Sequence, residues 1–503
     1  MNKFFSKISP GNLLLFLLLF LVIGLLTSHL RNEDILFHTD VARDFLVLEE
    51  IVQTKKPTLI GARSGGIPGV FHGPSWYYVN LPFFLFSQGN PVMMGWFWWL
   101  IGITAVFSFT FVIFKLTKNI TASLLGALCF SLILLPACAG PVNNYLADLF
   151  SFLVFLVWLR WYEKPTVLLS LIGWFGTGLL VQFQMAFAVP IILLLLPIFI
   201  WRTLKLKLYY QIPSILILAI PLSTFILFEL RHDFLQIKSV IQYIQGSGTA
   251  GATFVQRVWE RFQLMSLGAT DIFSIPKFLA PVVVIAFVYI GVKSNNKQIK
   301  KSLQLLGYLY FAWWIISLVF SGSVWSYYFS PFWGIFLLVI SLIAAQSHLA
   351  KILLFFLILS LFSSRKVEFF YSPSRFDASS WKLLSGIAKD GLAKENQGYF
   401  LYSQDQFAYP LKYAFSYFLK RHPNIQADAF KKKNWTVLVK AADDPNNPWL
   451  TAEYWQHEKV KITQEPALIK EYPFGYTLEV YNLEEKDLLV PSDPNLIQNL
   501  HFR

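Results

Sequence analysis

The sequence predicts a polytopic α-helical membrane protein, because apolar residues dominate its composition and gather in runs of membrane-spanning length. Of its 503 residues, 55% are hydrophobic and only 14% are charged, whereas a typical soluble domain carries about 25% charged residues. The apolar runs recur through the first three quarters of the chain, and each is close to the roughly 20 residues that a helix needs to cross a bilayer. The third observation is that lysine and arginine occur in alternate connections between these runs, as in the cytoplasmic loops of membrane proteins.

About eleven membrane spans follow from the apolar runs. They are predicted near 11–30, 91–114, 120–138, 145–162, 166–182, 185–201, 208–229, 274–292, 302–320, 326–346 and 349–364. Lysine or arginine follows the second, fourth, sixth and eighth spans, whereas the short connections 139–144, 182–184 and 321–325 contain neither. Because positively charged loops stay in the cytoplasm, the N-terminus is predicted inside and, after an odd number of spans, the C-terminal tail outside.

This topology predicts a transmembrane domain over 1–364 and an extracytoplasmic domain over 365–503. The first and second large outer loops are predicted at 31–90 and 230–273. The tail alternates strand-like and helix-like stretches, which predicts a small soluble α/β domain. The expected strands are 398–403, 435–440, 467–472 and 476–483, and the expected helices are 380–389 and 410–421.

Several functional classes are excluded by the sequence. The formal net charge of +13 comes partly from the cytoplasmic loops, and no basic stripe interleaved with aromatic residues predicts nucleic-acid binding. Cys129 and Cys138 lie on one predicted helix, about 13 Å apart at 1.5 Å per residue, so they do not form a disulfide with each other. No Asp-x-Asp metal motif and no dinucleotide-binding glycine motif is present, so neither a metal nor a cofactor is predicted.

The stretch HTDVARDFLVLEEIVQTKK, residues 38–56, directly follows the first span and predicts an amphipathic juxtamembrane helix. Its apolar face is formed by Val41, Phe45, Leu48 and Val52. Thr39 is the predicted N-cap and Pro57 the stop signal, and the helix is expected to lie in the plane of the membrane surface. Asp40 and Asp44 share another face, with Arg43 three residues from Asp40. Two interpretations stay open on spacing alone: a helix cap with an ion pair, or a reactive centre.

A glycine-rich stretch, GARSGGIPGV at 61–70, follows in the same loop and allows close approach of backbone to a ligand. FHGPSWYYVNLPFFL at 71–85 then predicts a new helix with Pro74 in its first turn. Aromatic residues such as Tyr77 are typical of the membrane interface, but anchoring explains neither His72 nor the glycines.

Together these motifs resemble the GT-C superfamily of integral membrane glycosyltransferases. The resemblance rests on Asp-x-Ala-Arg-Asp at 40–44, the glycine-rich stretch, and Gly-Pro-x-x-Tyr-Tyr at 73–78, in the order of the branch that includes protein O-mannosyltransferases and lipid A aminoarabinose transferases. Further matches follow in the same order, namely PVNN at 141–144, QFQ at 182–184, FELRHDF at 228–234 and SYYFSPFWGIF at 326–336. QFQ lacks the histidine that several relatives carry, so that residue's role has no counterpart here.

The resemblance implies a sugar donor linked to a polyprenyl phosphate, which acts as a co-substrate, and transfer on the extracytoplasmic side of a bacterial plasma membrane. The acceptor is expected to be an envelope glycan, a lipid or a protein. The leaving phosphate needs cationic or hydrogen-bonding partners, and the candidates outside the membrane are Arg63, His72, Arg257 and Arg261. Arg257 and Arg261 share a helix face, which fits either a phosphate fork or a contact with anionic lipid.

Asp40 is the predicted general base, because it matches the family's catalytic carboxylate and a carboxylate in hydrogen-bond reach can deprotonate an acceptor hydroxyl. Asp44 and Arg43 are the expected supports, and a single inverting displacement is the simplest mechanism. Tyr77, Tyr328, Asn144 and Gln182 are candidate sugar or phosphate contacts, with anchoring and helix capping as their structural alternatives. The competing functions are a transporter, or a flippase or ligase of lipid-linked glycans; a polar path through the bundle would favour the transporter.

Overall fold

The computed structural model describes residues 9–496 apart from 248–252, 321, 323, 364–375, 395, 406 and 447. The chain divides into two compact units that do not follow the predicted division at residue 364. The first comprises 1–28, 58–78 and 98–371, and the second comprises 29–57, 79–97 and 372–503. The first outer loop therefore contributes to both units, and its segment 29–57 belongs with the C-terminal domain.

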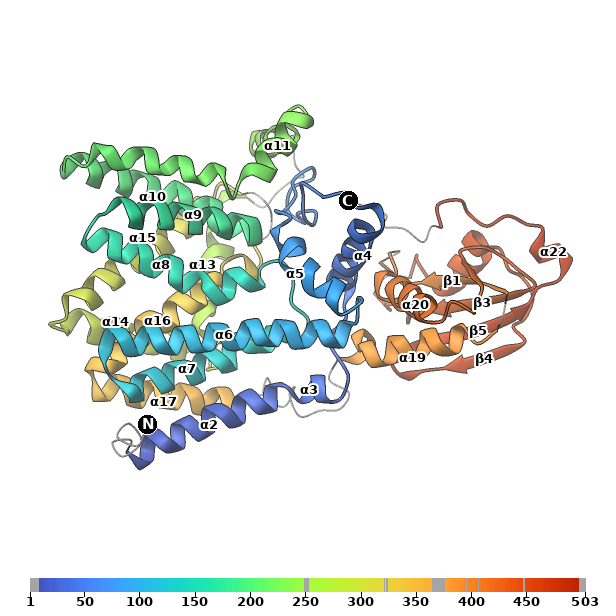
Figure 1. The fold of residues 1–503 in the computed structure, drawn as a ribbon, viewed down its shortest axis with the longest axis horizontal. Coiled ribbons are helices and arrows are strands. Elements are labelled where there is room, and N and C mark those ends of the chain that lie inside the picture. The colour runs from blue at the N-terminus through green and yellow to red at the C-terminus, as the bar shows by residue number, and fades with distance from the viewer. Residues whose placement is uncertain are drawn as a thin grey trace. The chain divides into compact units, whose positions relative to one another are not determined.

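The first unit is built mainly from apolar helices, which run side by side in Figure 1. In the described residues, four segments are long and apolar enough to cross a membrane: α6 (Pro91–Thr117), Ile120–Ala139, α8 (Tyr145–Glu163) and α10 (Met185–Lys205). Ile120–Ala139 consists of α7 (Ile120–Leu134) and the 3-10 segment η1 (Leu135–Ala139). A fifth candidate is η2 (Tyr209–Ala219) followed by α11 (Ser223–Arg231), which are bent by 62°.

The remaining predicted spans also coincide with helices. Five shorter apolar helices are α2 (Pro10–Leu26), α9 (Val167–Phe183), α14 (Leu279–Lys293), α16 (Pro331–Gln346) and α17 (His348–Ser363). The predicted span 302–320 lies within and just beyond α15 (Lys297–Ser317). Side-chain oxygens that accept from free backbone N–H groups fix several helix starts, and Ser9, Asn119, Thr166 and Asn296 act in this way.

The core of the first unit is rich in aromatic side chains. Neighbouring helices lie close together where a small residue of one helix faces a large residue of the other. Trp158 of α8 packs edge-on against Trp174 of α9, with ring centroids 4.8 Å apart, and lies over Gly173. Its indole N–H donates to the Thr177 hydroxyl at 3.0 Å, so that this polar group remains paired although it is buried.

The second outer loop contains α12 (Leu235–Gln242), the π-helical turn η3 (Tyr243–Ser247) and α13 (Phe254–Phe273).

The second unit contains the predicted α/β domain, whose sheet has the strand order β2-β1-β3-β5-β4. Its strands are β1 (Gln397–Tyr402), β2 (Ala427–Ala429), β3 (Trp435–Lys440), β4 (Leu468–Glu471) and β5 (Thr477–Asn482). β1 pairs in parallel with β2 and β3, and β5 pairs antiparallel with β3 and β4. All four predicted strands and both predicted helices are confirmed, the helices as α19 (Trp381–Gly391) and α20 (Tyr409–Arg421).

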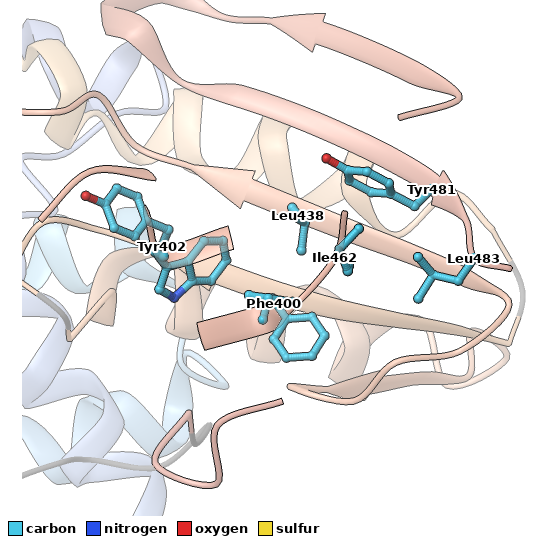
Figure 2. Close-up of a cluster of buried hydrophobic side chains, with 8 residues drawn as sticks. Phe400, Tyr402, Leu438, Ile462, Tyr481 and Leu483 are labelled. Carbon is cyan, nitrogen blue, oxygen red and sulfur yellow. The ribbon is translucent and has the colours of Figure 1, made fainter. Parts of the chain in front are cut away.

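One face of this sheet packs on a compact hydrophobic cluster (Figure 2), which includes Phe400, Leu438 and Ile462, each fully buried. The two smaller helices α21 (Ala452–Tyr454) and α22 (Glu485–Leu488) and the π-helical turn η6 (Trp455–Val460) complete the domain. The same unit also contains the juxtamembrane helix α4 (Thr39–Thr54), preceded by α3 (Ser28–Arg31) whose first residue belongs to the other unit. α5 (Ser75–Phe86) begins in the first unit and ends in the second.

Candidate functional site

The two predicted carboxylates lie on α4, and Arg43 links them. Its Nη1 donates to Oδ1 of Asp40 at 2.6 Å, while Nε and Nη2 donate to Oδ1 of Asp44 at 3.0 and 2.8 Å. The side chain of Asp40 is 55% exposed, whereas that of Asp44 is only 6% exposed. Asp44 thus fixes the guanidinium from the buried side, and Asp40 presents its carboxylate outward.

The start of α4 differs from the prediction in its cap. His38, not Thr39, is the N-cap, because its Nδ1 accepts from the backbone N–H of Asp40 at 3.2 Å. Thr39 instead donates its hydroxyl to Oδ2 of Asp405 in the C-terminal domain at 2.9 Å. The prediction of a Thr39 cap was therefore wrong, since the hydroxyl has a partner remote in sequence. The helix ends at Thr54, three residues before Pro57, with Lys55 in the left-handed conformation.

The glycine-rich part of the first outer loop, in the first unit, folds back on itself as an irregular hairpin. Gly61 N–H donates to the His72 carbonyl at 2.7 Å, and His72 N–H donates to the Ala62 carbonyl at 2.8 Å. Arg63 and Phe71 form the next bridge of this pairing. Arg63 is exposed and His72 is half-buried. Two of the four predicted phosphate ligands therefore belong to this hairpin, although they stand in successive pairs of it and not opposite one another.

The end of this hairpin is tied to the membrane helices by Gln182, the last-but-one residue of α9. Its Oε1 accepts from the Ser75 hydroxyl at 3.0 Å, and its Nε2 donates to the Pro221 carbonyl at 2.5 Å and the Thr224 hydroxyl at 3.0 Å. Gln182 is only 1% exposed. In this structure it joins the start of α5 to the bend between η2 and α11.

Gly73 is required at this junction for steric reasons. A Cβ added to Gly73 would lie 2.6 Å from Cδ and 2.8 Å from Cα of Gln182. Tyr77, one turn into α5, is also buried. The Gly-Pro-x-x-Tyr-Tyr motif therefore marks the place where the loop enters the helix bundle.

A buried carboxyl group, Asp148, lies in the first turn of α8 and was missed by the sequence analysis. Its Oδ1 accepts from the Ser330 hydroxyl at 2.6 Å, and its Oδ2 accepts from the Asn144 side chain at 2.9 Å. Asp148 is 8% exposed. Because Asp148 stands only four residues after Asn144, it resembles an ordinary acidic residue in the first turn of a helix. The one signal that the sequence offered was an acid inside an apolar run.

The neighbouring amides also have structural partners. Asn143 donates to the Phe183 carbonyl at 2.7 Å, and Gln184 donates to the Tyr327 carbonyl at 2.9 Å. The Gln184 Oε1 is buried and accepts no hydrogen bond within the described part of the chain. Tyr328 is 8% exposed, and its hydroxyl lies 3.4 Å from the position that a Cβ on Gly66 would take. Of the predicted residues, Tyr328 is thus buried in the first unit, whereas Asn144 is half-buried.

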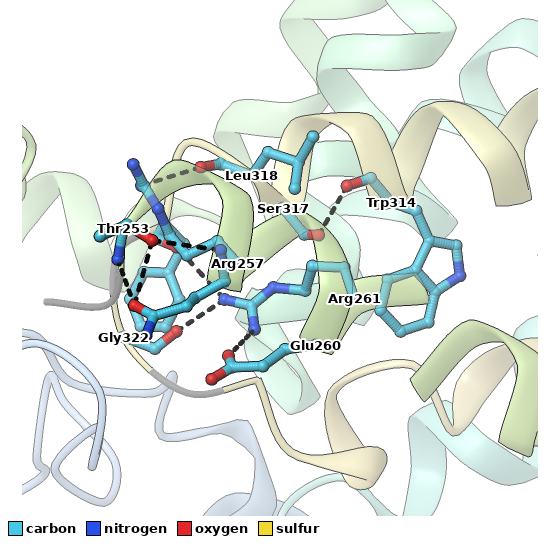
Figure 3. Close-up of polar contacts among 10 residues, drawn as sticks. Thr253, Arg257, Glu260, Arg261, Trp314, Ser317, Leu318 and Gly322 are labelled. Carbon is cyan, nitrogen blue, oxygen red and sulfur yellow. Dashed lines mark hydrogen bonds and ion pairs between the residues drawn. The ribbon is translucent and has the colours of Figure 1, made fainter. Parts of the chain in front are cut away.

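Arg257 and Arg261 lie on one face of α13, as their spacing predicts, and both bind the chain that follows α15 (Figure 3). Arg257 Nη1 donates to the Leu318 carbonyl at 3.1 Å, and Arg261 Nη2 donates to the Gly322 carbonyl at 2.6 Å. Arg261 also pairs with Glu260 at 3.3 Å. Burial lowers the pKa of the Arg261 guanidinium from its ordinary value. The C-terminal end of a helix favours cations, which fits the contact of Arg257 with Leu318, the C-cap of α15. Arg261 binds the carbonyls of Phe320 and Gly322 beyond that helix.

Within the described ranges, no group of three or more His, Cys, Asp or Glu side chains is arranged to hold a metal ion. The candidates are distributed over both compact units, with Asp40, Arg43 and Asp44 in the second and all the others in the first.

Comparison with solved structures identifies the fold. ArnT from Cupriavidus metallidurans, in a crystal structure bound to undecaprenyl phosphate, matches with a TM-score of 0.57 over 95% of this chain and 99% of that one, at 10% identity. Its structure in the apo state matches with a TM-score of 0.59 over 96% of this chain and 99% of that one, also at 10% identity. The chain has a GT-C glycosyltransferase fold.

No family model and no curated protein matches the sequence. The GT-C fold is therefore established by structure, in agreement with the resemblance of the motifs at 40–44 and 73–78. A likeness at this identity concerns the fold, and the roles of individual residues stay predictions.

Proposed function

We propose that this protein transfers a sugar from a polyprenyl-phosphate-linked donor to an acceptor on the extracytoplasmic side of a bacterial plasma membrane. The observation that carries the proposal is the nearly full-length match to a GT-C protein whose crystal structure contains undecaprenyl phosphate. The proposed topology has eleven spans, with the N-terminus inside and the domain at 365–503 outside. It is supported by the helices at each predicted span and by the positive-inside distribution of charge.

Asp40 is the proposed general base. Its Oδ1 is bonded to Arg43, and no hydrogen bond within the described residues occupies its Oδ2, which we expect to accept the acceptor's proton. The acceptor oxygen then attacks the anomeric carbon, and the bond from that carbon to the phosphate oxygen breaks with its electron pair leaving on the phosphate. A single displacement of this kind inverts the anomeric configuration, and base catalysis supplies roughly 10²–10⁴-fold.

Arg43 and Asp44 have supporting roles in this proposal. Because Arg43 donates to both carboxylates, it holds the Asp40 side chain in one rotamer. Asp44 fixes the opposite edge of the guanidinium, so that Arg43 cannot turn away. An ion pair and a general base are compatible, since an oriented carboxylate transfers a proton more effectively than a mobile one.

Arg63 and His72 are the proposed phosphate-binding residues. Both belong to the hairpin at 61–72, in which Arg63 is exposed and His72 is half-buried. Arg257 and Arg261 each donate to backbone carbonyls, so their contribution is the shape and positive potential of the surrounding surface. Tyr77, Asn144 and Tyr328 are proposed to line the sugar side. Gln182 is proposed to hold the junction instead, because its amide is bonded to Ser75, Pro221 and Thr224. The proposal includes no metal and no cofactor beyond the lipid-linked donor.

Complementation of a deletion strain tests the proposal. Mass spectrometry of lipid-linked sugars and envelope glycans is expected to show an accumulated donor and a missing sugar, which would identify both substrates. The wild-type chain should restore the glycan, whereas Asp40→Asn should not, although it inserts and folds normally. Glu50→Gln, which removes a charge from the same helix, is the matched control and should restore it.

Two outcomes would refute parts of this proposal. Full restoration by Asp40→Asn would exclude Asp40 as the base. A strain that lacks the sugar because its lipid-linked intermediate stays on the cytoplasmic side would favour the flippase alternative.

A further inference from the structure

The chain segment that leads into α4 is bound to the C-terminal domain of the same compact unit. Phe37 N–H donates to the Ser379 carbonyl at 2.7 Å, and Trp381 N–H donates to the Ile35 carbonyl at 3.2 Å. Asp34, which is buried, accepts from the Ser380 hydroxyl at 2.8 Å and from the backbone N–H of Lys382 at 3.0 Å. This places a carboxylate at the N-terminus of α19, where the helix dipole favours negative charge.

Aromatic rings pack α4 on α20 and the segment before α4 on α19. Phe45 of α4 contacts Tyr413 of α20 with ring centroids 5.0 Å apart, and Phe37 contacts Trp381 of α19 at 4.9 Å. Phe37, Phe45 and Tyr413 are at most 2% exposed. The Tyr413 hydroxyl donates to the Gly89 carbonyl at 2.6 Å, so the ring has one fixed position between these segments.

Two polar contacts fix α4, one at its start and one in its third turn. At its start, Thr39 donates to Asp405, whose other oxygen accepts from the backbone N–H groups of Phe407 and Ala408 at 3.0 and 3.2 Å. Asp405 is therefore held by its own loop and offers a fixed acceptor to Thr39. In the third turn, the buried Glu49 forms an ion pair with Lys420 and accepts from the Ser416 hydroxyl at 2.9 Å.

These contacts leave Asp40 outward while the helix that carries it is fixed at its start and in its third turn. We infer that the C-terminal domain positions the proposed base, with Asp405 and Lys420 as positioning residues that act through Thr39 and Glu49. The inference rests on the proposed function. Because a misplacement of about 1 Å can cost about 10²-fold in rate, a domain remote in sequence can control the reaction without touching the substrates.

Conservative and disruptive substitutions at the two contacts test the inference. Thr39→Val keeps the shape of the side chain and removes the hydroxyl, whereas Thr39→Ser retains it. Lys420→Met removes the ion pair with Glu49, whereas Lys420→Arg retains a cation. The matched control is Lys459→Met, which removes an ion pair of 2.6 Å with Asp493 in the same domain but in neither contact with α4.

The assay uses the purified full-length chain, with extracted lipids and membranes of the deletion strain as the source of donor and acceptor. Thr39→Val and Lys420→Met are expected to lower the maximal transfer rate roughly 10-fold and to leave the amount of extract needed for half-saturation unchanged. Thr39→Ser, Lys420→Arg and Lys459→Met should retain the wild-type rate. The melting temperature of each variant confirms that it is folded, and Thr39→Val carries the test if Lys420→Met does not fold.

The outcomes separate this inference from the proposed function. If Asp40→Asn is active, the assignment of the base fails, whatever the other variants do. If Asp40→Asn is inactive but Thr39→Val and Lys420→Met transfer at the wild-type rate, the positioning role is wrong. A changed half-saturation with an unchanged maximal rate would also overturn it, because that result indicates substrate binding by the domain.

Discussion

Replacing Gly73 by alanine should disrupt the junction between the first outer loop and the membrane helices. A Cβ at this position would lie 2.6 Å from Cδ and 2.8 Å from Cα of Gln182. The side chain of Gln182 cannot move away without loss of its bonds to Ser75, Pro221 and Thr224. The Cα belongs to the backbone at the end of α9, so that a rotamer change alone does not remove the clash.

The magnitude follows from these two effects. Overpacking of a buried site costs about 1–3 kcal/mol, and each hydrogen bond of Gln182 that is given up costs a further ~0.5–1.5 kcal/mol. We therefore expect Gly73→Ala to lower the free energy of unfolding by about 2–5 kcal/mol. Thermal unfolding of the purified chain in detergent, followed together with the yield of monodisperse protein, measures this loss.

Gly307→Ala is the matched control, because Gly307 lies within α15 of the same unit and a Cβ there would have no atom within 4 Å. Alanine in a helix is favoured over glycine by roughly 0.5–1 kcal/mol, so this variant should melt at or above the wild-type temperature. If Gly73→Ala melts together with Gly307→Ala, the close approach at Gln182 is not what requires glycine, and the reasoning is wrong.

Three further predictions follow from the described contacts. Gln182→Leu should lower the melting temperature while leaving the half-saturation for donor unchanged; the reverse pattern would support the sugar-binding role predicted from sequence. Arg43→Lys should reduce transfer about 10-fold or more, because one ammonium group cannot reproduce the fork that spans Asp40 and Asp44; a wild-type rate would contradict that. Burial lowers the pKa of Lys412 to about 8, below that in the unfolded chain. The unfolded state therefore binds more protons between that value and about 10.4, and stability rises with pH over this window. Lys412→Met should hence stabilise the chain more at pH 7 than at pH 10, as measured by thermal unfolding. An equal rise of the melting temperature at both pH values would show that protonation of Lys412 is not coupled to folding.

The elements of the C-terminal domain could be predicted from sequence because their patterns are local. β3 (Trp435–Lys440) and β5 (Thr477–Asn482) are short apolar or alternating runs. α20 has a proline in its first turn and the basic residues Lys420 and Arg421 in its last. β2 (Ala427–Ala429) was not predicted, because three residues at a sheet edge carry no periodicity. The long apolar helices were predictable for the same local reason, whereas the bend of 62° after η2 was not.

The partners of the site residues could not be predicted in the same way, because they depend on distant parts of the chain. Thr39 has the residue type of a cap, but its hydroxyl is bonded to Asp405. The helical spacing of Arg257 and Arg261 correctly placed them on one face of α13, but it did not reveal that backbone carbonyls after α15 would accept their hydrogen bonds. The residue types thus indicated which side chains form strong polar contacts. The partner of each side chain is shown only by the fold.

The division of the first outer loop gives the motif order a physical meaning. Residues 29–57 are fixed within the second unit by the C-terminal domain, and residues 58–78 are fixed within the first unit, where Gln182 binds Ser75. Because each half has its own supports, substitutions that loosen them should have separable effects. Changes at Asp405 or Lys420 should act on the step for which Asp40 is the proposed base. Changes around Gly73 should act on stability and on the hairpin that is proposed to bind phosphate. If the whole loop belonged to one unit, both sets of variants should have the same effects. The idea of two independent supports is therefore wrong if the variants at Asp405 and Lys420 lose stability and transfer activity in the same proportion as those around Gly73.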